Sequence, residues 1–320
     1  MNYRERAECL YGTPLLSGIC ERLEKEMKAA KQHKYDTIYK QLAEGLNDIL
    51  APCEIHMRGT ANSSILTYIY GLSDIEPIGT NLYPEMLWGI DGNKQPVTEM
   101  VVPKGKCDVV KDRLRCISSV KVFGSDVKEQ IYRLAVKTGI KASDIHLQDK
   151  ELCKFFQNCC ENESSIEFVA EQLQFETVPV ETVKKAIKLL KPYSRADYVR
   201  LFGVLYSTDC WTENQEQFVL EGMIQPNSII SDIETLYEFL MEHGIDRAEA
   251  FSITEQVRKG KVLTGEQKLI LKDKGVPKHY IEVLEKIKYL WTRASSISFI
   301  NDIWRLAYYK LNYPEAYTSL

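Results

Sequence analysis

The sequence predicts a predominantly helical α+β protein with two domains. Its 320 residues exceed the roughly 100 to 200 residues of one typical domain. The hydrophobic content of 44 % and the aromatic content of 10 % are ordinary for a globular core. Short strand and helix patterns alternate up to about residue 125, and helical patterns then continue almost without interruption. We therefore expect a small α/β domain over 1–125, followed by a multi-helix domain over 126–320.

Two amphipathic helices are predicted near the N-terminus. Apolar side chains recur there at helical spacing, at Leu15, Ile19, Leu23 and Met27 and again at Ile38, Leu42, Leu46 and Ile49. The alternating segment 53–57 then fits a short strand, and the apolar residues of 65–70 fit another helix. Strand, glycine-containing loop and helix in this order are typical of an α/β layer.

Residues 74–125 form the least regular part of the sequence. Prolines and glycines interrupt it, at Pro77, Pro84, Pro96, Pro103, Gly79, Gly89, Gly92 and Gly105. Their density indicates turns and short strands, and the best strand candidates are 97–102 and 115–123. We place the domain boundary after Gly124, because the residues that follow have a helical pattern.

Helical signals dominate the second domain. Its first helix is lined by Val127, Ile131 and Leu134 and ends at Gly139. Side chains that can cap a helix N-terminus recur with a polar partner three residues later, at Ser194, Ser231, Asp246 and Thr264. A final helix is expected from about 296 to 311. Several short helices joined by glycines favour a compact helical domain over a coiled coil or a repeat array.

The charge balance limits where a polyanion could bind. A formal net charge of −4, from 41 Lys and Arg against 45 Asp and Glu, argues against nucleic-acid binding over the whole surface. The stretch 209–255 is acidic, whereas 184–200 and 258–288 are basic. Solvated helix faces commonly have such charges, so the two basic stretches keep polyanion binding open without requiring it.

The termini and the cysteines predict an intracellular protein. The charged N-terminus has no apolar centre, so we expect no secretion signal and a cytoplasmic location. No apolar run approaches the ~20 residues of a membrane-spanning helix, and we expect no membrane partner. The nine cysteines include no Cys-x-x-Cys pair. Their number and spacing therefore argue against a disulfide framework and a zinc site, and we expect no metal.

The loop from Arg58 to Ser64 is the best ligand candidate on residue chemistry alone. Gly59 frees the backbone at the end of a predicted strand, and Ser63 and Ser64 would stand at a helix N-terminus whose N–H groups attract an anion. The pattern matches neither a Walker loop nor a dinucleotide fingerprint. An ordinary strand-to-helix turn with hydroxyl caps is the alternative.

A series of motifs follows in one order along most of the chain. The loop Arg58-Gly59-Thr60-Ala61-Asn62-Ser63-Ser64 is similar to an Arg-Gly-Ser-Val-Gly-Ser-Ser loop. The stretch from Gly203 through Ser207-Thr208-Asp209-Cys210-Trp211 is similar to Gly-Leu-Ser-His-Gly-Thr-Asp-Val-Trp. Further matches stand at 258–263, 276–280, 287–289 and 305–314. Together they resemble the bacterial DNA polymerase III alpha subunit of the PolC type, over roughly four-fifths of the chain.

This resemblance implies a reduced palm over 1–125 and fingers over 126–320. In that family the palm loop and basic finger residues surround the incoming triphosphate. Carried over residue by residue, the candidate nucleotide-binding residues are Arg58, Gly59, Ser63, Ser64, Lys288 and Arg293. The candidate DNA-binding residues are Arg258, Lys259 and Lys261. A finger motif that includes a histidine in the family corresponds to 292–299, where Ser295 replaces that histidine.

The departures from the family concern the catalytic metals. Nucleotide addition needs carboxylates that hold two Mg²⁺ ions. The family supplies them from Pro-Asp-Ile-Asp and Leu-Asp-Ile-Leu-Gly motifs, but this sequence contains no Asp-x-Asp, and Lys121-Val122-Phe123-Gly124 is collinear with the second motif. The family's zinc-binding cysteine cluster is also missing beyond the palm loop. We therefore expect no catalytic residues and no cofactor.

The main hypothesis is a PolC-like protein that binds DNA, a nucleoside triphosphate or a replisome protein without polymerising. One alternative is residual DNA polymerase or nucleotidyltransferase activity, in which relocated carboxylates such as Asp91, Asp108 and Asp112 would hold Mg²⁺. A second alternative is a protein-interaction scaffold whose acidic 209–255 block contacts a basic partner.

Overall fold

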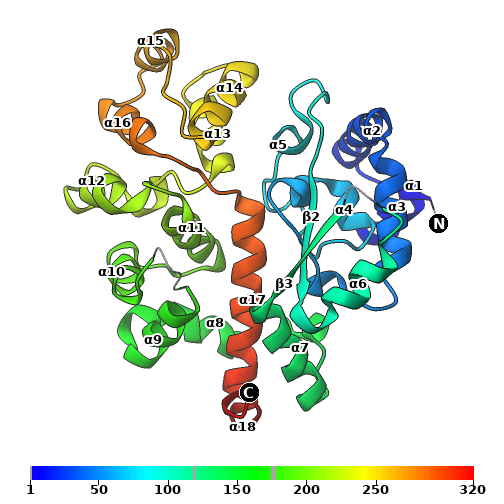
Figure 1. Cartoon of the computed structure of the whole chain (residues 1–320). Helices are drawn as coiled ribbons and strands as arrows, with labels where there is room; N and C mark the ends of the chain where they lie inside the picture. The colour runs from blue at the N-terminus through cyan, green and yellow to red at the C-terminus, as the bar shows by residue number, and fades with distance from the viewer. Residues whose placement is uncertain (1, 118–119, 174–177) are drawn as a thin grey trace. The chain divides into compact units, whose positions relative to one another are not determined.

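The computed structural model describes residues 2–117, 120–173 and 178–320. The chain divides into two compact units: unit 1 contains residues 1–146 and 305–320, and unit 2 contains residues 147–304. Helices dominate both units, and the strands form one small three-stranded sheet in unit 1 (Figure 1). The predicted class, predominantly helical α+β, is confirmed.

Unit 1 consists of short helices around the sheet. Its helices are α1 (Tyr3–Tyr11), α2 (Ser17–Gln32), α3 (Tyr35–Leu46), α4 (Ile65–Ile69), α5 (Pro84–Trp88), α6 (Cys107–Arg113), α7 (Asp126–Thr138), α18 (Pro314–Thr318) and the C-terminal part of α17 (Arg293–Asn312). Its strands are β1 (His56–Met57), β2 (Thr98–Pro103) and β3 (Val120–Ser125). Single 3₁₀ turns lie at η1 (Pro52–Glu54), η2 (Ala61–Ser63), η3 (Lys104–Lys106) and η4 (Ala142–Asp144).

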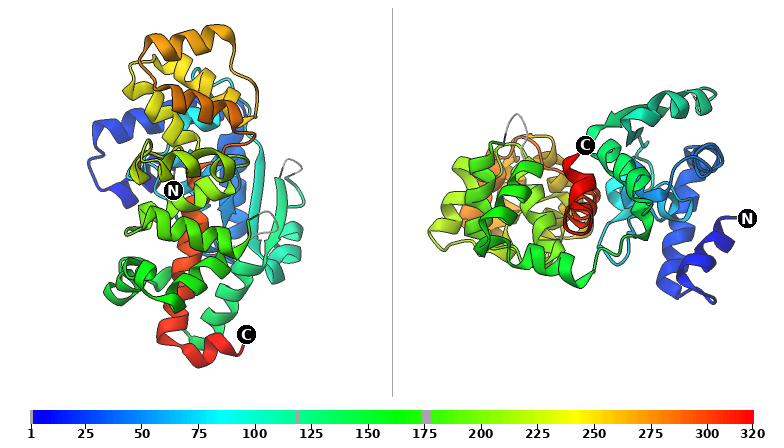
Figure 2. Two further views of the ribbon diagram at one scale, coloured as in Figure 1. Left: turned by 90° about the vertical axis from the view of Figure 1, so that its left-hand side faces the viewer. Right: turned by 90° about the horizontal axis from the view of Figure 1, so that it is seen from below.

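The sheet has the order β1-β2-β3. β1 pairs antiparallel with β2, with His56 opposite Val101. β2 pairs parallel with β3, with Glu99 opposite Lys121, and α6 makes the crossover between these two strands. Figure 2 shows β2 and β3 running side by side. Because side chains alternate along a strand, one face of β2 holds the buried Met100 and the other holds Glu99.

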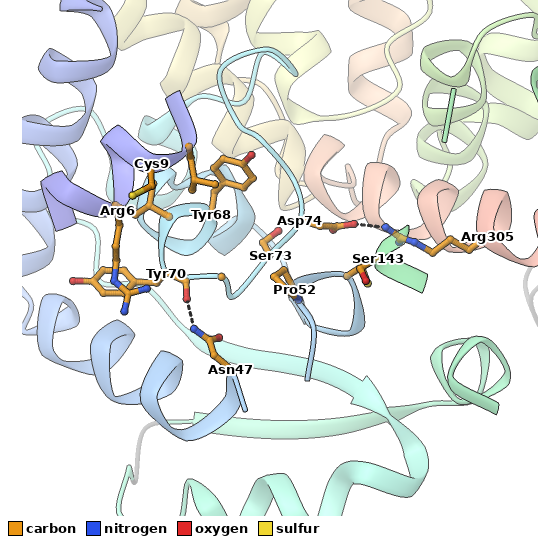
Figure 3. A pocket seen from close by; sticks show the side chains of 14 residues that line it. Arg6, Cys9, Asn47, Pro52, Tyr68, Tyr70, Ser73, Asp74, Ser143 and Arg305 are labelled. Atoms are coloured by element: carbon orange, nitrogen blue, oxygen red, sulfur yellow. Dashed lines mark hydrogen bonds and ion pairs between the residues drawn. The ribbon is translucent and has the colours of Figure 1, made fainter. Parts of the chain in front are cut away.

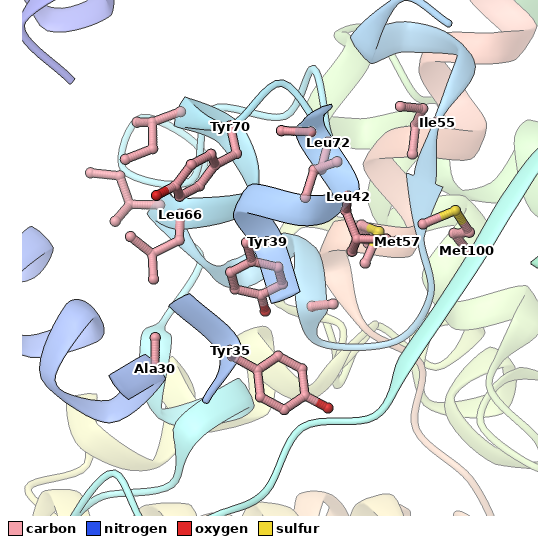
Figure 4. Packing of buried hydrophobic residues seen from close by; sticks show 14 of the residues in the cluster. Ala30, Tyr35, Tyr39, Leu42, Ile55, Met57, Leu66, Tyr70, Leu72 and Met100 are labelled. Carbon is pink, nitrogen blue, oxygen red and sulfur yellow. The ribbon is translucent and has the colours of Figure 1, made fainter. Parts of the chain in front are cut away.

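The hydrophobic core of unit 1 lies between α2, α3, α4 and the inner face of the sheet (Figure 4). Leu42, Leu66 and Met100 are fully buried there. The Tyr35 hydroxyl donates a hydrogen bond of 2.6 Å to the Pro96 carbonyl oxygen, which satisfies the buried hydroxyl group. The apolar positions that predicted two helices are therefore the positions that fill this core.

Two strand predictions need correction. The expected strand over 53–57 is a strand only at its last two residues, because Pro52–Glu54 forms a 3₁₀ turn. The Glu54 carboxylate accepts the Ala51 N–H at 2.7 Å, which stabilises that turn. The strand expected over 115–123 begins at Val120, and residues 118–119 of it lie outside the described residues. The strand expected over 97–102 is confirmed by β2.

Unit 1 includes two segments that the sequence analysis placed in the helical domain, 126–146 and 305–320. The first follows β3 without a break, since Ser125 ends the strand and caps α7 through the Lys128 N–H. The second is tied back to the first, because the Tyr309 hydroxyl donates to the Ile140 carbonyl oxygen at 2.7 Å. The predicted boundary at residue 125 separates a palm-like region from a fingers-like region, which is a different division from that into compact units. This boundary stays a prediction.

Unit 2 is built from helices. They are α8 (Lys150–Gln157), α9 (Glu163–Gln172), α10 (Val180–Leu190), α11 (Arg195–Tyr206), α12 (Glu216–Leu220), α13 (Ile233–Glu242), α14 (Arg247–Arg258), α15 (Gly265–Asp273), α16 (Lys278–Lys286) and the N-terminal part of α17. Short turns lie at η5 (Cys159–Glu161) and η7 (Pro226–Ser228), and a distorted turn, η6, lies at Trp211–Gln215.

Three of the four predicted N-caps in unit 2 are confirmed. Ser194, Asp246 and Thr264 cap α11, α14 and α15 with their side chains. The fourth prediction, Ser231, is wrong by one residue: Asp232 caps α13. The Ser231 hydroxyl instead donates to the Asp232 carboxylate at 2.8 Å. The expected final helix is confirmed as α17.

The core of unit 2 includes an aromatic stack. The rings of Phe156 and Trp304 are parallel, with their centroids 3.4 Å apart, and Tyr198 packs edge-on against both. The Tyr198 hydroxyl donates to the Phe156 carbonyl oxygen at 2.8 Å.

No helix within the described ranges is long and apolar enough to cross a membrane.

Truncation of Leu42 to alanine should destabilise the chain by about 3 kcal/mol, because a fully buried leucine leaves a cavity in the core of unit 1. The matched control is Leu16→Ala, where the side chain is 72 % exposed and the expected change is below about 0.5 kcal/mol. Urea denaturation of both variants and the parent chain measures the difference. Equal losses in the two variants would contradict the packing described above.

Candidate functional site

The loop Arg58–Ser64 connects β1 to α4 and holds four of the predicted nucleotide-binding residues. Gly59 has φ of +65°, a conformation that favours glycine, and Arg58 has a side chain that is 47 % exposed. Ser63 and Ser64 are fully buried. Asn62 is also buried, and its amide donates to His56 Nδ1 at 2.9 Å. The loop therefore exposes its first residues and buries its last ones.

The His56 ring adds no positive charge beside this loop at neutral pH. Burial lowers the pKa of His56 to about 3, and the nearby cations Lys128 and Arg58 contribute to the shift. The Lys128 ammonium group is itself buried and donates to the Cys53 carbonyl oxygen at 3.0 Å. Arg58 is therefore the exposed cation of this loop.

A buried carboxylate occupies the N-terminus of α4. Glu26 of α2 is fully buried and accepts hydrogen bonds from the Ser64 hydroxyl at 2.5 Å, the Trp88 indole N–H at 3.1 Å and the Ile65 N–H at 3.2 Å. Arg22 Nε lies 2.9 Å from Oε1, the oxygen that also accepts the Ile65 N–H. These four partners compensate the burial of the charge. Glu26 thus holds the position at which the sequence analysis placed a phosphate, and the role of Ser63 and Ser64 as nucleotide ligands stays a prediction.

The exposed face of the sheet holds one carboxylate between two cations. Glu99 of β2 lies 3.2 Å from Arg58 Nη1 and 3.3 Å from Lys121 Nζ of β3. The Arg58 guanidinium also lies over the Phe123 ring, 4.9 Å from its centroid. Lys121 therefore points to the same face as Glu99 and neutralises it. Within the described residues, no group of three or more His, Cys, Asp or Glu side chains is placed to hold a metal ion.

A separate cavity of about 480 Å³ lies in unit 1. It is lined by α1, η1, α4 and the residues that follow α4, together with Ser143 of η4 and Arg305 of α17. Figure 3 shows Arg305 paired with Asp74 at its wall, with 2.6 Å between Nη2 and Oδ2. On the opposite side, the Arg6 guanidinium lies 5.1 Å from the centroid of the Tyr70 ring. None of the sequence-predicted site residues lines this cavity.

Three of the family-like motifs meet in unit 2, at a place that we call the Gly260–Lys288 junction: Thr208, residues 258–261 and residues 288–290. Gly260 has φ of +62°, and a Cβ atom there would overlap the Lys288 carbonyl oxygen. The Thr208 and Lys288 segments are joined by Lys288 N–H to Thr208 O at 3.0 Å, and by Thr208 N–H to Tyr289 O at 2.9 Å. The Leu290 N–H donates to the Arg258 carbonyl oxygen at 3.3 Å.

The junction brings together four of the predicted cations. The side chains of Lys259, Lys261 and Lys288 are exposed, whereas that of Arg258 is only 17 % exposed. Glu255, on the preceding turn of α14, lies 2.9 Å from Arg258 Nη1 and 2.9 Å from Lys259 Nζ. The Arg258 guanidinium is therefore held on its own helix by Glu255, and the backbone carbonyl of Arg258 makes the contact with the 288–290 segment. The lysines provide the exposed positive charge.

Arg293 is held by acidic side chains of α13. Its guanidinium makes two contacts with Glu238, at 2.9 and 2.6 Å, and lies 3.4 Å from the Asp232 carboxylate. Its backbone N–H donates to Glu234 Oε2 at 2.8 Å. Because its side chain is only 14 % exposed, Arg293 anchors the start of α17. Its role as a nucleotide ligand stays a prediction.

The acidic cluster around Arg293 shifts the pKa values of its members. Burial raises the pKa of Glu234 to about 7, with a further contribution from the Asp232 charge, although Arg293 opposes the shift. Burial alone would lower the pKa of Arg293, but Asp232 and Glu238 raise it above its usual range. Glu234 is therefore the group of this cluster that changes charge near neutral pH.

The sequence analysis did not identify the residues that hold the Arg58–Ser64 loop and the Gly260–Lys288 junction in place. Glu26 is one polar residue within an amphipathic helix, and its partner Ser64 is 38 positions away. Thr208 carries no local signal of its contact with Lys288. Signals existed for Glu255, whose i, i+4 spacing to Lys259 favours an ion pair, and for Gly260, because a glycine within a basic segment indicates either a turn or a close backbone approach.

Comparison with known proteins relates the chain to one group of enzymes. The chain is 30 % identical over 203 residues to the PolC-type DNA polymerase III of Clostridium perfringens. This chain is a partial relative of PolC-type DNA polymerase III. The corresponding enzyme of Thermotoga maritima is 33 % identical over 134 residues, and that of Staphylococcus aureus is 27 % identical over 208 residues. No family profile matches the chain.

The alignments cover only part of this chain and only part of each PolC enzyme. The Clostridium perfringens alignment covers 61 % of this chain and 14 % of the polymerase, and the Thermotoga maritima alignment covers 42 % and 10 %. The alignments thus cover less of the chain than the four-fifths expected from the motifs. The chain spans about one seventh of the length of the PolC relatives that it matches.

Replacement of Gly260 by alanine should destabilise the chain by more than about 2 kcal/mol, because the new methyl group meets the Lys288 carbonyl oxygen and forces the junction apart. Gly244→Ala is the matched control: its φ is +73°, but nothing lies within 4 Å of the added Cβ atom. The control should lose only about 1 kcal/mol, the cost of the positive φ. Urea denaturation measures both, and equal losses would show that the junction contact is unimportant for folding.

Stability should depend on the Glu234 carboxyl between pH 5 and pH 8. The unfolded carboxyl loses its proton near pH 4.5, whereas the folded one keeps it until about pH 7. The stabilisation from this proton is therefore complete below pH 4.5 and is lost as the pH rises through 7. Relative to Glu234→Gln, the parent chain should lose about 2 kcal/mol of unfolding free energy between pH 5 and pH 8. Parallel pH profiles for the two proteins would contradict this assignment.

Proposed function

We propose that this chain is a PolC-like protein that binds DNA through the Gly260–Lys288 junction and does not polymerise nucleotides. In this proposal residues 1–125 correspond to a reduced palm and residues 126–320 to fingers. The observation that carries the proposal is the junction itself. Residues that are about 30 to 80 positions apart in sequence meet through backbone contacts and expose Lys259, Lys261 and Lys288 together.

The chemistry of the junction suits a phosphate backbone. Each lysine that neutralises a phosphate releases condensed counterions, so several exposed lysines on a fixed backbone favour binding at moderate salt. The net charge of −4 and the acidic stretch 209–255 restrict such binding to a local surface. Lys259 is paired with Glu255, but its own side chain is 54 % exposed and Glu255 also pairs with Arg258, so Lys259 can contact a phosphate without leaving Glu255 unpaired.

The sheet of unit 1 supports a protein without polymerase chemistry. The sequence contains no Asp-x-Asp, and Lys121 lies beside Glu99 on the exposed face of the sheet. Glu99 alone, flanked by two cations, does not supply the several carboxylates that two Mg²⁺ ions need. The proposal therefore requires no cofactor. The alternative, nucleotidyl transfer with relocated carboxylates, would require Mg²⁺.

A nucleoside triphosphate is a secondary candidate ligand. Of the residues proposed for it, Lys288 is exposed at the junction and Arg58 is exposed on unit 1, whereas Ser64 and Arg293 already bind internal carboxylates. Replisome proteins are further candidate partners, because the PolC relatives are DNA polymerases. Both proposals are subordinate to DNA binding.

The test is a titration of the full chain with a fluorescent primer-template duplex at several salt concentrations. The double variant Lys259→Glu, Lys261→Glu should bind at least roughly tenfold more weakly, and its log–log salt dependence should be less steep by about two. The matched control is Lys150→Glu, Lys154→Glu on α8, which changes the charge by the same amount at exposed positions. The control should retain the affinity of the parent chain.

Two outcomes would change the proposal. Templated extension of the primer in the presence of Mg²⁺ or Mn²⁺ would favour the enzymatic alternative. No binding of duplex DNA, single-stranded DNA or nucleotide by the parent chain would favour the interaction scaffold. An equal loss of affinity in both double variants would show that binding follows total charge rather than the junction.

A further inference from the structure

The outer edge of β3 is the first observation behind the inference. β3 pairs with β2 along one side, and among the described residues no strand pairs with its other side (Figure 1). In a strand, successive backbone N–H and C=O groups point alternately to the two edges. The Val120 N–H, at the start of the strand, donates to the Ile117 carbonyl oxygen at 3.3 Å. Beyond it, a strand edge of this kind presents donors and acceptors to which another extended chain can bind.

A groove of about 450 Å³ runs along this edge. One wall is the C-terminal end of α6 and the residues after it, and the other wall is the strand itself. The lining residues are Lys111, Leu114, Arg115, Ile117 and the β3 residues 120–123. Lys111, Arg115 and Lys121 give this lining three positive charges, and no acidic residue contributes to it.

The three cations are accessible. The side chain of Arg115 is 76 % exposed and that of Lys121 is 70 % exposed, and Lys111 is also exposed. Arg115 lies 3.5 Å from Asp112, and Lys121 lies 3.3 Å from Glu99, but both pairs are at the surface. Surface pairs contribute little and can be exchanged for contacts with an acidic ligand.

Apolar side chains alternate with these cations. Leu114 is buried, Ile117 and Val122 are half-buried, and Phe123 is 39 % exposed beneath the Arg58 guanidinium. An extended chain beside β3 would direct alternate side chains to the two faces of the sheet. One set would contact the apolar wall of α6, and the other set would lie near Lys121.

We infer that this groove binds an extended acidic peptide segment of a partner protein, which adds to the sheet as a strand beside β3. Main-chain hydrogen bonds to the strand edge would provide affinity, and acidic side chains that alternate with apolar ones would provide specificity. The inference concerns unit 1 alone and does not rest on DNA binding at the Gly260–Lys288 junction.

Two other occupants fit the groove less well. A nucleic-acid strand would satisfy the cations, but its backbone has no N–H donors to match the carbonyl groups of the β3 edge. A second copy of the chain, paired through β3, would bring the Lys111, Arg115 and Lys121 charges of both copies together. Like charges in adjacent strands are destabilising.

The test titrates the full chain with a fluorescent, acetylated peptide in which valine and glutamate alternate. Saturable binding is expected, together with slower hydrogen exchange of the backbone amides within 121–123. A peptide of the same sequence with N-methyl groups along one edge should not bind, because it cannot donate to the strand. Binding of the methylated peptide, or binding without protection of β3, would overturn the inference.

Charge-reversal variants locate the site. Lys111→Glu, Arg115→Glu should weaken peptide binding at least roughly tenfold at low salt. Lys28→Glu, Lys31→Glu on α2 is the control with the same charge change, and it should bind the peptide as the parent chain does. Circular dichroism of each variant checks that it is folded. Protection of the β3 amides by oligo-dT in place of the peptide, or equal binding of a valine–lysine peptide, would contradict the acidic-peptide assignment.

Discussion

The proposed binding surface depends on the approach of the Gly260 backbone to the Lys288 carbonyl oxygen. No other residue fits at position 260, since the backbone has a positive φ and the space for a Cβ atom is already filled. The contact holds the end of α14 against the segment before α17, and three backbone hydrogen bonds join that segment to Thr208. Three lysines are exposed from this framework. Main-chain packing therefore positions the backbone from which these lysines extend, and Lys259 is also paired with Glu255.

The residues that the family-like motifs predict as ligands differ in how deeply their side chains are buried. Lys288 is exposed, whereas Arg293, five residues later, is bound by Glu238 and Asp232. The same distinction holds in unit 1, where Arg58 is exposed and Ser64 is buried against Glu26. Glu26 places a fixed negative charge at the start of α4. The two units thus differ: exposed cations at the junction are available for an external anion, whereas the end of the Arg58–Ser64 loop is satisfied from within the chain.

The parts of the fold that depend on local patterns could be predicted from sequence. The periodic apolar residues of α2 and α3, and the caps Ser194 and Thr264, act within a few residues of their own positions. The strand predicted over 53–57 was only partly correct, because Pro52 and Glu54 stabilise a 3₁₀ turn in place of its first residues.

The candidate site could be predicted only in part. The motifs identified the basic residues, but not which of them are exposed, because exposure follows from long-range packing. Ser64 and Trp88 meet Glu26 across 38 and 62 positions, and nothing in the sequence near Glu26 reveals these contacts. For the same reason, the sequence predicted Arg293 and Lys288 alike as nucleotide ligands. Only the fold shows that Asp232 and Glu238 bind the Arg293 guanidinium.

The most direct measurement of the central claim is the acetylation rate of each lysine, followed by mass spectrometry with and without a primer-template duplex. The duplex should slow acetylation of Lys259, Lys261 and Lys288 and leave Lys150 and Lys154 unchanged. This result would place DNA at the Gly260–Lys288 junction. Protection at other lysines while those of the junction react at their free rates would contradict the account.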